Sequence, residues 1–281
     1  MSKKKELSQD VFGNRMKGYE KSTQSLIDPK DHMIVRLDGK KFSKFTKGFL
    51  KPFDDILSRV MVQTTSDLLE EFGAVSGYTQ SDEITLVLPA MYQKDGKKII
   101  NNQISKGRVD KVASVFASTA TLRFNMNLLK EFENLSSNTT EEYQEMLHSK
   151  LFKAVFDGRA FGVPDDIEAF NAVLWRMRDA EKNSKSMFCQ RWVGHKKTLN
   201  MNGDEKVILC KKETGQDWND QRDGYKYGFL IKKQLFKISV DNKYLKYGDE
   251  HSSSERTRII IIEQKINFSE KNVKLIMKRK I

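Results

Sequence analysis

The sequence predicts an α+β fold of the ferredoxin-like type, an antiparallel sheet with two helices on one face. Two observations support this prediction. Up to residue 164 the expected elements follow the order strand, helix, hairpin, helix, strand, which is the split βαβ arrangement. The chain of 281 residues is also long enough to bury one large core or two smaller ones.

The first strand and first helix are predicted from periodicity and from the residues that end them. His32 to Leu37 form a short, mainly hydrophobic run that stops at the turn pair Asp38-Gly39. Apolar residues then recur at helical spacing from about residue 54 to residue 72. Gly73 follows directly, as glycine commonly does just past a helix end.

The hairpin, the second helix and the fourth strand complete the arrangement. Residues 75–78 and 84–88 are the expected hairpin strands, joined by a tight connection at 81–83. A longer helix is expected from residue 109 to about residue 130, and its alanine and serine residues would let it lie close to a sheet. Residues 154–161 provide the fourth strand.

We divide the chain into residues 1–164 and residues 165–281, because the pattern changes beyond Pro164. In the first part, 131–146 is the least hydrophobic interior stretch, which predicts an exposed loop or insertion. The second part is expected to pack on the first as a mixed α/β region. It has helical patterns at 167–187 and 204–212 and strand-like patterns at 225–238 and 256–263.

The charge favours a polyanionic partner. Lys and Arg total 50 against 38 acidic residues, which gives a net charge of +12. Each phosphate that a basic side chain neutralises releases counterions and so favours binding of nucleic acid. The excess recurs along the whole chain, at Lys3 to Lys5, 36–51, 94–111, 191–212 and Lys274 to Lys280.

The cysteines and the N-terminus predict a reducing compartment. Cys189 and Cys210 do not have the spacing of a zinc site or a disulfide framework. The start of the chain lacks the apolar core of a signal peptide, and no apolar run approaches the roughly 20 residues of a membrane span. We therefore expect a cytoplasmic protein that does not contact membranes.

Two acidic residues lie where predicted strands meet turns. Asp38 ends the first strand, and Asp82 lies in the hairpin connection. If these strands are neighbours, the two carboxylates lie close together and repel unless a cation lies between them. Oxygen ligands of this kind, completed by water and phosphate, are what Mg²⁺ accepts. Ordinary turns are the alternative, since Asp-Gly and Ser-Asp-Glu are common turn sequences. Six basic residues around Asp38 favour a bound triphosphate: Arg36, Lys40, Lys41, Lys44, Lys47 and Lys51.

The motifs around these carboxylates resemble those of a known enzyme family. Arg36-Leu37-Asp38-Gly39, followed by Phe42 and Phe45, and Gln80-Ser81-Asp82-Glu83 are similar to the two carboxylate motifs of the tRNA-histidine guanylyltransferases, which are 3′-to-5′ polymerases. The likeness covers most of residues 10–235. It continues in order through Lys51-Pro52, Phe156-Asp157-Gly158-Arg159 and Trp175-Arg176-Met177-Arg178-Asp179.

The resemblance implies a polymerase palm and a nucleotidyltransferase that uses two Mg²⁺ ions. Asp38 and Asp82 would ligate the ions, with the backbone oxygen of Gly39 as a third ligand. Two metals stabilise the attacking and leaving oxygens of a phosphoryl transfer. Glu83 would bind metal or polarise a water molecule, unless it is only a surface charge of the hairpin. The implied substrates are tRNA and ATP, GTP or other nucleoside triphosphates, and the implied assembly is a homotetramer.

The residues after Asp38 are candidates for nucleotide binding. Gly39 is expected to let the backbone turn sharply against the phosphates, while the rings of Phe42 and Phe45 are expected in the core. Backbone N–H groups can hold a triphosphate as anion-binding nests do. The N–H groups that follow the turn are those of Lys40, Lys41, Phe42 and Ser43.

The resemblance extends the nucleotide site to Lys51, from the Lys-Pro pair, and to Ser81 beside Asp82. Arg108 and Lys111, at the start of the second long helix, would reach the triphosphate or the RNA 5′ end, or would lie on a solvated helix face. Four further charged residues are interpreted as a buried ion-pair framework: Asp157, Arg159, Arg176 and Asp179.

One departure from the family pattern favours a branch of it. Eukaryotic members carry His-Ile-Asn-Asn-Leu-Tyr-Asn where this chain has residues 181–187, and only one asparagine is kept. The chain is more similar to the guanylyltransferase-like proteins of bacteria and archaea, which also share Gly194-His195-Lys196-Lys197 and Trp218-Asn219-Asp220. In that branch the implied activity is template-dependent repair of tRNAs truncated at the 5′ end.

Three alternatives stay open. The same chemistry would serve a narrow tRNA-His guanylyltransferase that adds a single G. A nucleotide cyclase shares the palm and the metal aspartates, but its Gly-Gly-Asp-Glu-Phe hairpin is replaced here by Gln80 to Ile84. A non-catalytic RNA-binding module has the same topology, but residues 32–37 offer no aromatic pair for stacking bases.

Overall fold

The computed structural model describes residues 9–90, 104–239 and 253–281. Its centre is a six-stranded sheet in the order β4-β1-β3-β2-β5-β6, and every pairing between neighbouring strands is antiparallel. The strands are β1 (His32–Gly39), β2 (Ser76–Gln80), β3 (Glu83–Leu88), β4 (Phe156–Val163), β5 (Phe229–Ser239) and β6 (Ser253–Ile262).

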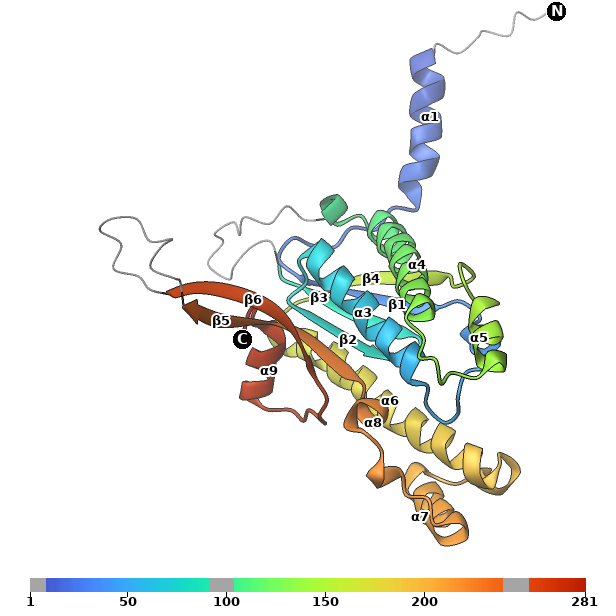
Figure 1. Ribbon diagram of the computed structural model, residues 1–281. Helices are drawn as coiled ribbons and strands as arrows, with labels where there is room; N and C mark the ends of the chain where they lie inside the picture. Colours follow the sequence, from blue (N-terminus) through green and yellow to red (C-terminus); the bar gives the residue numbers. More distant parts are fainter. Residues whose placement is uncertain (1–8, 91–103, 240–252) are drawn as a thin grey trace, which may run out of the picture.

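Helices cover both faces of this sheet (Figure 1). The helices α3 (Asp55–Phe72) and α4 (Val109–Glu133) pack on one face, and the long helix α6 (Asp166–Val193) packs on the other. The helix α1 (Gln9–Ser22) extends away from the body. The other helical segments are α2 (Phe42–Phe45), η1 (Ile104–Gly107), α5 (Glu141–His148), η2 (Lys196–Thr198), α7 (Gly203–Thr214), η3 (Trp218–Asp220), α8 (Asp223–Tyr227) and α9 (Glu270–Met277).

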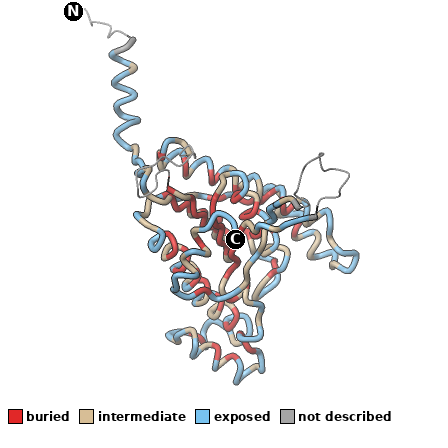
Figure 2. Tube along the Cα trace, turned by 90° about the vertical axis from the view of Figure 1, so that its left-hand side faces the viewer, coloured by how far each residue is buried: buried red, intermediate tan, exposed pale blue. Residues whose placement is uncertain are grey.

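Strand β1 shows how alternation sorts side chains between the two faces. Val35 and Leu37 pack in the hydrophobic cluster of α3 and α4, whereas Ile34 packs in the cluster of α6. Successive side chains of a strand point to opposite faces, so Arg36 and Asp38 lie on the α6 face. Figure 2 shows the buried residues gathered in the interior.

The predicted ferredoxin-like arrangement is confirmed by the first four strands with α3 and α4. The predicted helix at 54–72 is α3, which begins after Asp54, whose carboxylate accepts a hydrogen bond from the Leu57 N–H (2.9 Å). It ends at Gly73, which has a left-handed φ of 66°. Beyond residue 164, β5 and β6 extend the same sheet through the pairing of β5 with β2. No helix within the described ranges is long and apolar enough to cross a membrane.

Two segments differ from the prediction. The expected exposed loop or insertion at 131–146 is wrong in part, because only residues 134–140 form a loop and the rest belongs to the end of α4 and to α5. Thr140 caps α5 through a hydrogen bond from the Tyr143 N–H, and the Tyr143 hydroxyl donates to the buried Asp54 carboxylate (2.6 Å). The expected strand at 225–238 begins later, because α8 occupies its first residues and β5 starts at Phe229. Short helices of this kind are stabilised by caps and tertiary contacts rather than by periodicity.

A lysine is fully buried where β5 meets the C-terminal helix. Lys232 has no exposed surface, and its Nζ donates to the carbonyls of Val75, Ile276 and Lys278 and to the Ser76 hydroxyl. Burial lowers the pKa of Lys232 to about 7. The unfolded chain therefore binds this proton more readily than the folded chain at every pH between about 7 and the ordinary value of 10.5.

We expect Lys232→Met to remove a pH dependence of stability. In the wild type the free energy of unfolding contributed by Lys232 rises with pH from about 7 to 10, by up to about 4 kcal/mol. Denaturant unfolding at several pH values measures this. Lys237→Met, an exposed change in the same strand, is the matched control. Equal pH slopes in the two variants would contradict the prediction.

Candidate active site

The end of β1 carries the acidic residues that the sequence singled out. Asp38 lies directly opposite Glu83 of β3 and Asp157 of β4, so these three carboxylates share the α6 face. Asp82 lies in the β2–β3 turn, where its carbonyl accepts a hydrogen bond from the Gly39 N–H (3.0 Å). The strands of Asp38 and Asp82 are thus neighbours, as expected. The pKa of Asp82 is raised, first by burial and then by the negative charge of Asp38.

This pair suits a hard cation. The repulsion between two neighbouring carboxylates is relieved when a divalent ion lies between them. Within the described ranges, no three His, Cys, Asp or Glu side chains converge on a common metal position. Any ion held by Asp38 and Asp82 would therefore complete its shell with backbone, water or phosphate oxygens, as Mg²⁺ commonly does.

Glu83 is held by an ion pair. Arg176 Nε donates to Glu83 Oε1 (2.5 Å) and Arg176 Nη2 donates to Oε2 (2.7 Å). Both side chains are only 17% exposed, so the interpretation as a free surface charge is wrong. Burial raises the pKa of Glu83, and the bonds from Arg176 oppose that rise. Because both carboxylate oxygens accept hydrogen bonds from Arg176, Glu83 is better placed to hold the start of β3 beside Asp38 than to bind metal.

The predicted ion-pair framework is only partly present. Arg176 Nη2 lies 3.2 Å from Asp179 Oδ2. Asp157 and Arg159 are exposed instead, and neither has an ion-pair partner among the residues that the structure describes. The alternation of β4 explains the error, because Phe156 and Ala160 occupy the core face of that strand.

Gly39 and Phe42 have a packing role. A Cβ on Gly39 would lie 2.3 Å from Cδ2 of Phe42, so glycine is required by the close approach of that ring rather than by the expected sharp turn. The Phe42 ring is 2% exposed and packs against Phe124 and Phe156. The expectation that Phe42 and Phe45 belong to the core is confirmed.

The backbone after Gly39 offers part of the expected anion site. The Lys40 N–H donates to the Val155 carbonyl (2.8 Å), so it is not available to a phosphate, which corrects the prediction. Lys41 has a left-handed φ of 56° and precedes the first turn of α2. Its N–H and those of Phe42 and Ser43 have no hydrogen-bond acceptor in the described part of the chain. A left-handed residue followed by helical ones forms a concave set of donors.

Lys51 and Ser81 lie together. Both line a small cavity of about 80 Å³, beside the turn that carries Asp82. Met187 of α6 and Tyr225 of α8 close the cavity from the C-terminal half of the chain. The structure thus places Lys51 beside Ser81, next to the turn that carries Asp82.

Arg108 and Lys111 lie at the start of α4, apart from this group, which favours the alternative of a solvated helix face. The Phe156 N–H, opposite Gly39, donates to Thr121 Oγ1 in the middle of α4. Arg108 precedes Thr121 by more than three helical turns, about 20 Å along the axis, and pairs with Asp110 (2.7 Å). Sequence spacing alone could not show which end of α4 approaches the site.

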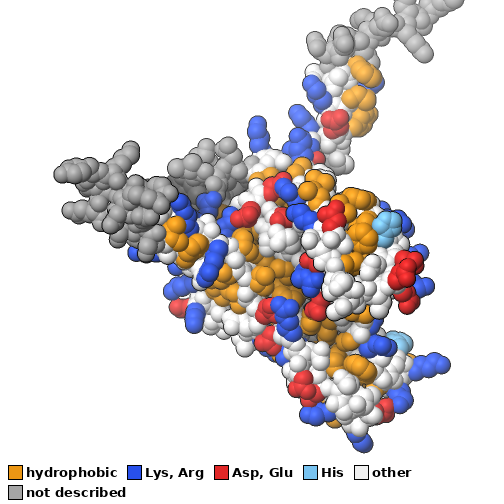
Figure 3. Space-filling model, in the orientation of Figure 1, with side chains coloured by type: hydrophobic (Ala, Val, Ile, Leu, Met, Phe, Trp, Pro, Cys, Tyr) orange, Lys and Arg blue, Asp and Glu red, His pale blue; other side chains and the backbone are white. Residues whose placement is uncertain are grey.

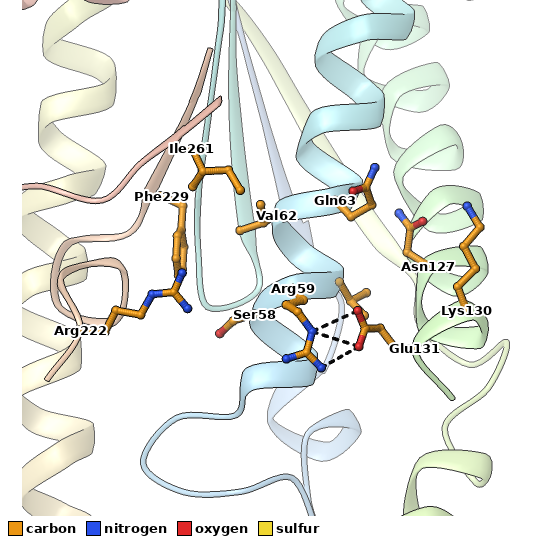
Figure 4. A pocket seen from close by; sticks show the side chains of 11 residues that line it. Ser58, Arg59, Val62, Gln63, Asn127, Lys130, Glu131, Arg222, Phe229 and Ile261 are labelled. Carbon is orange, nitrogen blue, oxygen red and sulfur yellow. Dashed lines mark hydrogen bonds and ion pairs between the residues drawn. The ribbon is translucent and has the colours of Figure 1, made fainter. Parts of the chain in front are cut away.

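A larger cavity of about 540 Å³ opens between α3, α4 and the β5–β6 hairpin. Figure 4 shows Arg222 and Phe229 on one side of it and the Arg59–Glu131 ion pair on the other. None of its lining residues belongs to the predicted site, although it shares Ser58 and Phe229 with the small cavity at Lys51.

Comparison with known proteins agrees with these motifs. The family model described as tRNAHis guanylyltransferase (Thg1) matches residues 13–164. An uncharacterised protein, R259, of Acanthamoeba polyphaga mimivirus is 35% identical over 246 residues, which are 86% of this chain and 83% of that protein.

Solved structures show the same fold. A bacterial Thg1-like protein in complex with ATP aligns with a TM-score of 0.65 and 32% identity, covering 79% of this chain and 87% of that one. A bacterial Thg1-like protein in complex with GTP aligns with a TM-score of 0.62 and 30% identity, covering 89% and 91%. The α+β sheet therefore matches the polymerase-palm structures of these proteins. The chain belongs to the tRNAHis guanylyltransferase family and is a nucleotidyltransferase.

Proposed function

We propose that the protein repairs tRNAs truncated at the 5′ end by adding nucleotides in the 3′-to-5′ direction, each complementary to the base opposite. The observation that carries this proposal is the proximity of Asp38, at the end of β1, to Asp82 in the β2–β3 turn. Nearby are the N–H groups of residues 41–43, which have no acceptor in the described part of the chain, and the cavity of Lys51 and Ser81. An acidic pair next to donors for phosphates suits nucleotidyl transfer.

Two Mg²⁺ ions are the proposed cofactors, held by the carboxylates of Asp38 and Asp82 and by the carbonyl of Gly39. When bound, such ions neutralise charge on the attacking and leaving oxygens of the phosphoryl transfer. The N–H groups of Lys41 to Ser43 and the ammonium of Lys51 would orient the triphosphates of the nucleotide substrates. Arg176 holds Glu83, the first residue of β3. The β2–β3 turn, which directly precedes Glu83, is thereby kept in the position that places Asp82 beside Asp38.

In the proposed reaction a 5′-monophosphate end is first activated with ATP, which forms a 5′-adenylylated RNA and releases pyrophosphate. The 3′-hydroxyl of the incoming nucleotide then attacks the activated 5′ phosphorus, forming the new O–P bond while AMP leaves. A 5′-triphosphate end would react in the same way with pyrophosphate as the leaving group. Bacterial relatives in complex with ATP and with GTP support both nucleotides as substrates.

The templated activity is favoured over addition of a single G by residues 181–187, which lack the histidine-containing segment of the eukaryotic enzymes. These residues continue α6, and Asn183 there donates to Asp179 (3.3 Å). Base pairing would then be the source of specificity.

The test is a tRNA lacking its first nucleotide, with the opposing base changed in turn to each of the four. We expect the added nucleotide to change with the opposing base, because base pairing selects it. Sequencing of the labelled products measures this. An added G whatever base lies opposite would replace the proposal by the tRNA-His guanylyltransferase activity.

The partner in this proposal is tRNA. Figure 3 shows Lys and Arg side chains spread over several elements of the visible face. The basic residues Lys3 to Lys5 and those at 94–103 lie outside the described residues. The homotetramer and the cytoplasmic location stay predictions.

A further inference from the structure

Aromatic and basic side chains lie beside Asp38 on the same sheet face. Arg36 precedes Asp38 by two residues in β1, and Arg159 of β4 lies directly opposite Arg36. Trp175 of α6 reaches the same place, since the Arg36 guanidinium carbon lies 5.3 Å from the centre of its ring. Phe161 of β4 is two residues beyond Arg159 on this face and is 39% exposed. We name Trp175, Arg36, Arg159 and Phe161 the arginine–aromatic patch.

The Trp175 side chain is held by charged neighbours, but it is not part of a hydrophobic core. The Arg176 guanidinium carbon lies 4.8 Å from the ring centre, and Arg176 is itself fixed by its hydrogen bonds to Glu83 and Asp179. Even so, Trp175 is 55% exposed and lies in none of the hydrophobic clusters. An exposed indole ring positioned by charged neighbours offers a flat surface for stacking.

We propose that the arginine–aromatic patch binds the unpaired bases of the template strand, which lie opposite the truncated 5′ end of the tRNA, with a base stacked on Trp175 and phosphates near Arg159. Proteins recognise single-stranded RNA by stacking bases on aromatic rings and arginine planes. The inference rests on the proposed function, because it takes RNA as the substrate.

The position of the patch favours RNA over the base of a nucleoside triphosphate. The backbone N–H groups that would bind a triphosphate follow Asp38 in the chain, at Lys41 to Ser43. Lys51 lines the cavity beside the β2–β3 turn. Arg36 and Arg159 are paired two residues before Asp38 along β1, so the patch lies on the other side of the acidic pair along the strand direction. Asp38 therefore lies between a place for triphosphates and a place for the RNA strand.

Trp175→Ala is expected to weaken binding of a short, fluorescently labelled single-stranded RNA by at least about fivefold, because one stacked base is lost. Trp175→Phe keeps a ring and should retain most of the affinity. Trp192→Ala is the matched control, since Trp192 lies on the same helix, is 41% exposed and has the Arg191 guanidinium 5.7 Å from its ring centre. Its RNA affinity should equal that of the wild type.

A second set of measurements separates the possible failures. Binding of GTP and ATP should be unchanged in Trp175→Ala, and loss of nucleotide affinity instead of RNA affinity would overturn the inference. If the wild type binds RNA and Trp175→Ala binds it equally well, the inference fails while the proposed function stands. A wild type that binds tRNA but not the short RNA would overturn the inference alone, and a wild type that binds neither would overturn both.

Arg159→Ala provides a variant that does not depend on the indole. Arg159 is exposed on an edge strand and has no ion-pair partner within the described chain, so the fold should be kept. We expect weaker RNA binding and a shallower dependence of affinity on salt, since one phosphate contact is lost. An unchanged salt slope and affinity would contradict the assignment of Arg159 to the patch.

Discussion

Asp38→Ala and Asp82→Ala are each expected to lower the rate of nucleotide addition by about a thousandfold or more, roughly 4 kcal/mol of barrier. Both carboxylates lie at the meeting point of β1 and the β2–β3 turn, where the charge of Asp38 contributes to the raised pKa of Asp82. Either change leaves a proposed metal pair with one carboxylate and removes stabilisation of the developing phosphate charge. Single-turnover rates on a truncated tRNA measure the effect.

Stability should respond in the opposite sense in the absence of metal. Because the like charges of Asp38 and Asp82 repel, Asp38→Ala is expected to leave the unfolding temperature unchanged or to raise it. For the rate of nucleotide addition, Asp157→Ala is the matched control. Asp157 lies directly opposite Asp38, but it is exposed on β4. Its rate should stay within about tenfold of the wild type. A loss of less than tenfold in either Asp38→Ala or Asp82→Ala would exclude the two-metal assignment.

Much of the fold could be predicted because its main elements have strong periodicity. The pattern from 54 to 72 carries both a cap residue and a terminal glycine, and α3 has the predicted length. The order of strands and helices then allows few topologies. The stretch at 131–146 could not be assigned in this way. Its helix depends on Thr140 as a cap and on the bond from Tyr143 to Asp54, a contact that joins distant parts of the chain.

The site was predicted where it is local in sequence and missed where it is not. Asp38 and Asp82 end adjacent elements, so their proximity follows from strand pairing. The partner of Glu83 is Arg176, which lies 93 residues further along the chain. The contact of Trp175 with Arg36 depends equally on how α6 crosses the sheet. Patterns of residue type carry no information on such crossings, although the resemblance to the Trp-Arg motif singled out the segment.

The ion pair between Glu83 and Arg176 allows the role of Glu83 to be decided. The notion that Glu83 ligates metal predicts that Glu83→Gln would be as damaging as Asp38→Ala. The structure instead has both Glu83 oxygens bound by the guanidinium of Arg176. Glutamine keeps the shape and one acceptor, so we expect Glu83→Gln to lower the rate by about tenfold at most. A loss as large as that of Asp38→Ala would restore Glu83 as a metal ligand.

Arg176→Met is expected to destabilise the fold by about 3 kcal/mol, because it leaves the largely buried Glu83 carboxylate without its partner. The pKa of Glu83 is already raised by burial, and loss of Arg176 would raise it further. A carboxyl group with a raised folded pKa binds a proton more readily in the folded chain, so stability falls as pH rises through that pKa. The loss in Arg176→Met should therefore be larger at pH 8 than at pH 5, as measured by denaturant unfolding. Combining Glu83→Gln with Arg176→Met removes the unpaired charge and should recover most of the lost stability. If the double variant is as unstable as Arg176→Met at both pH values, Arg176 stabilises the protein by packing on Trp175 and not by its charge.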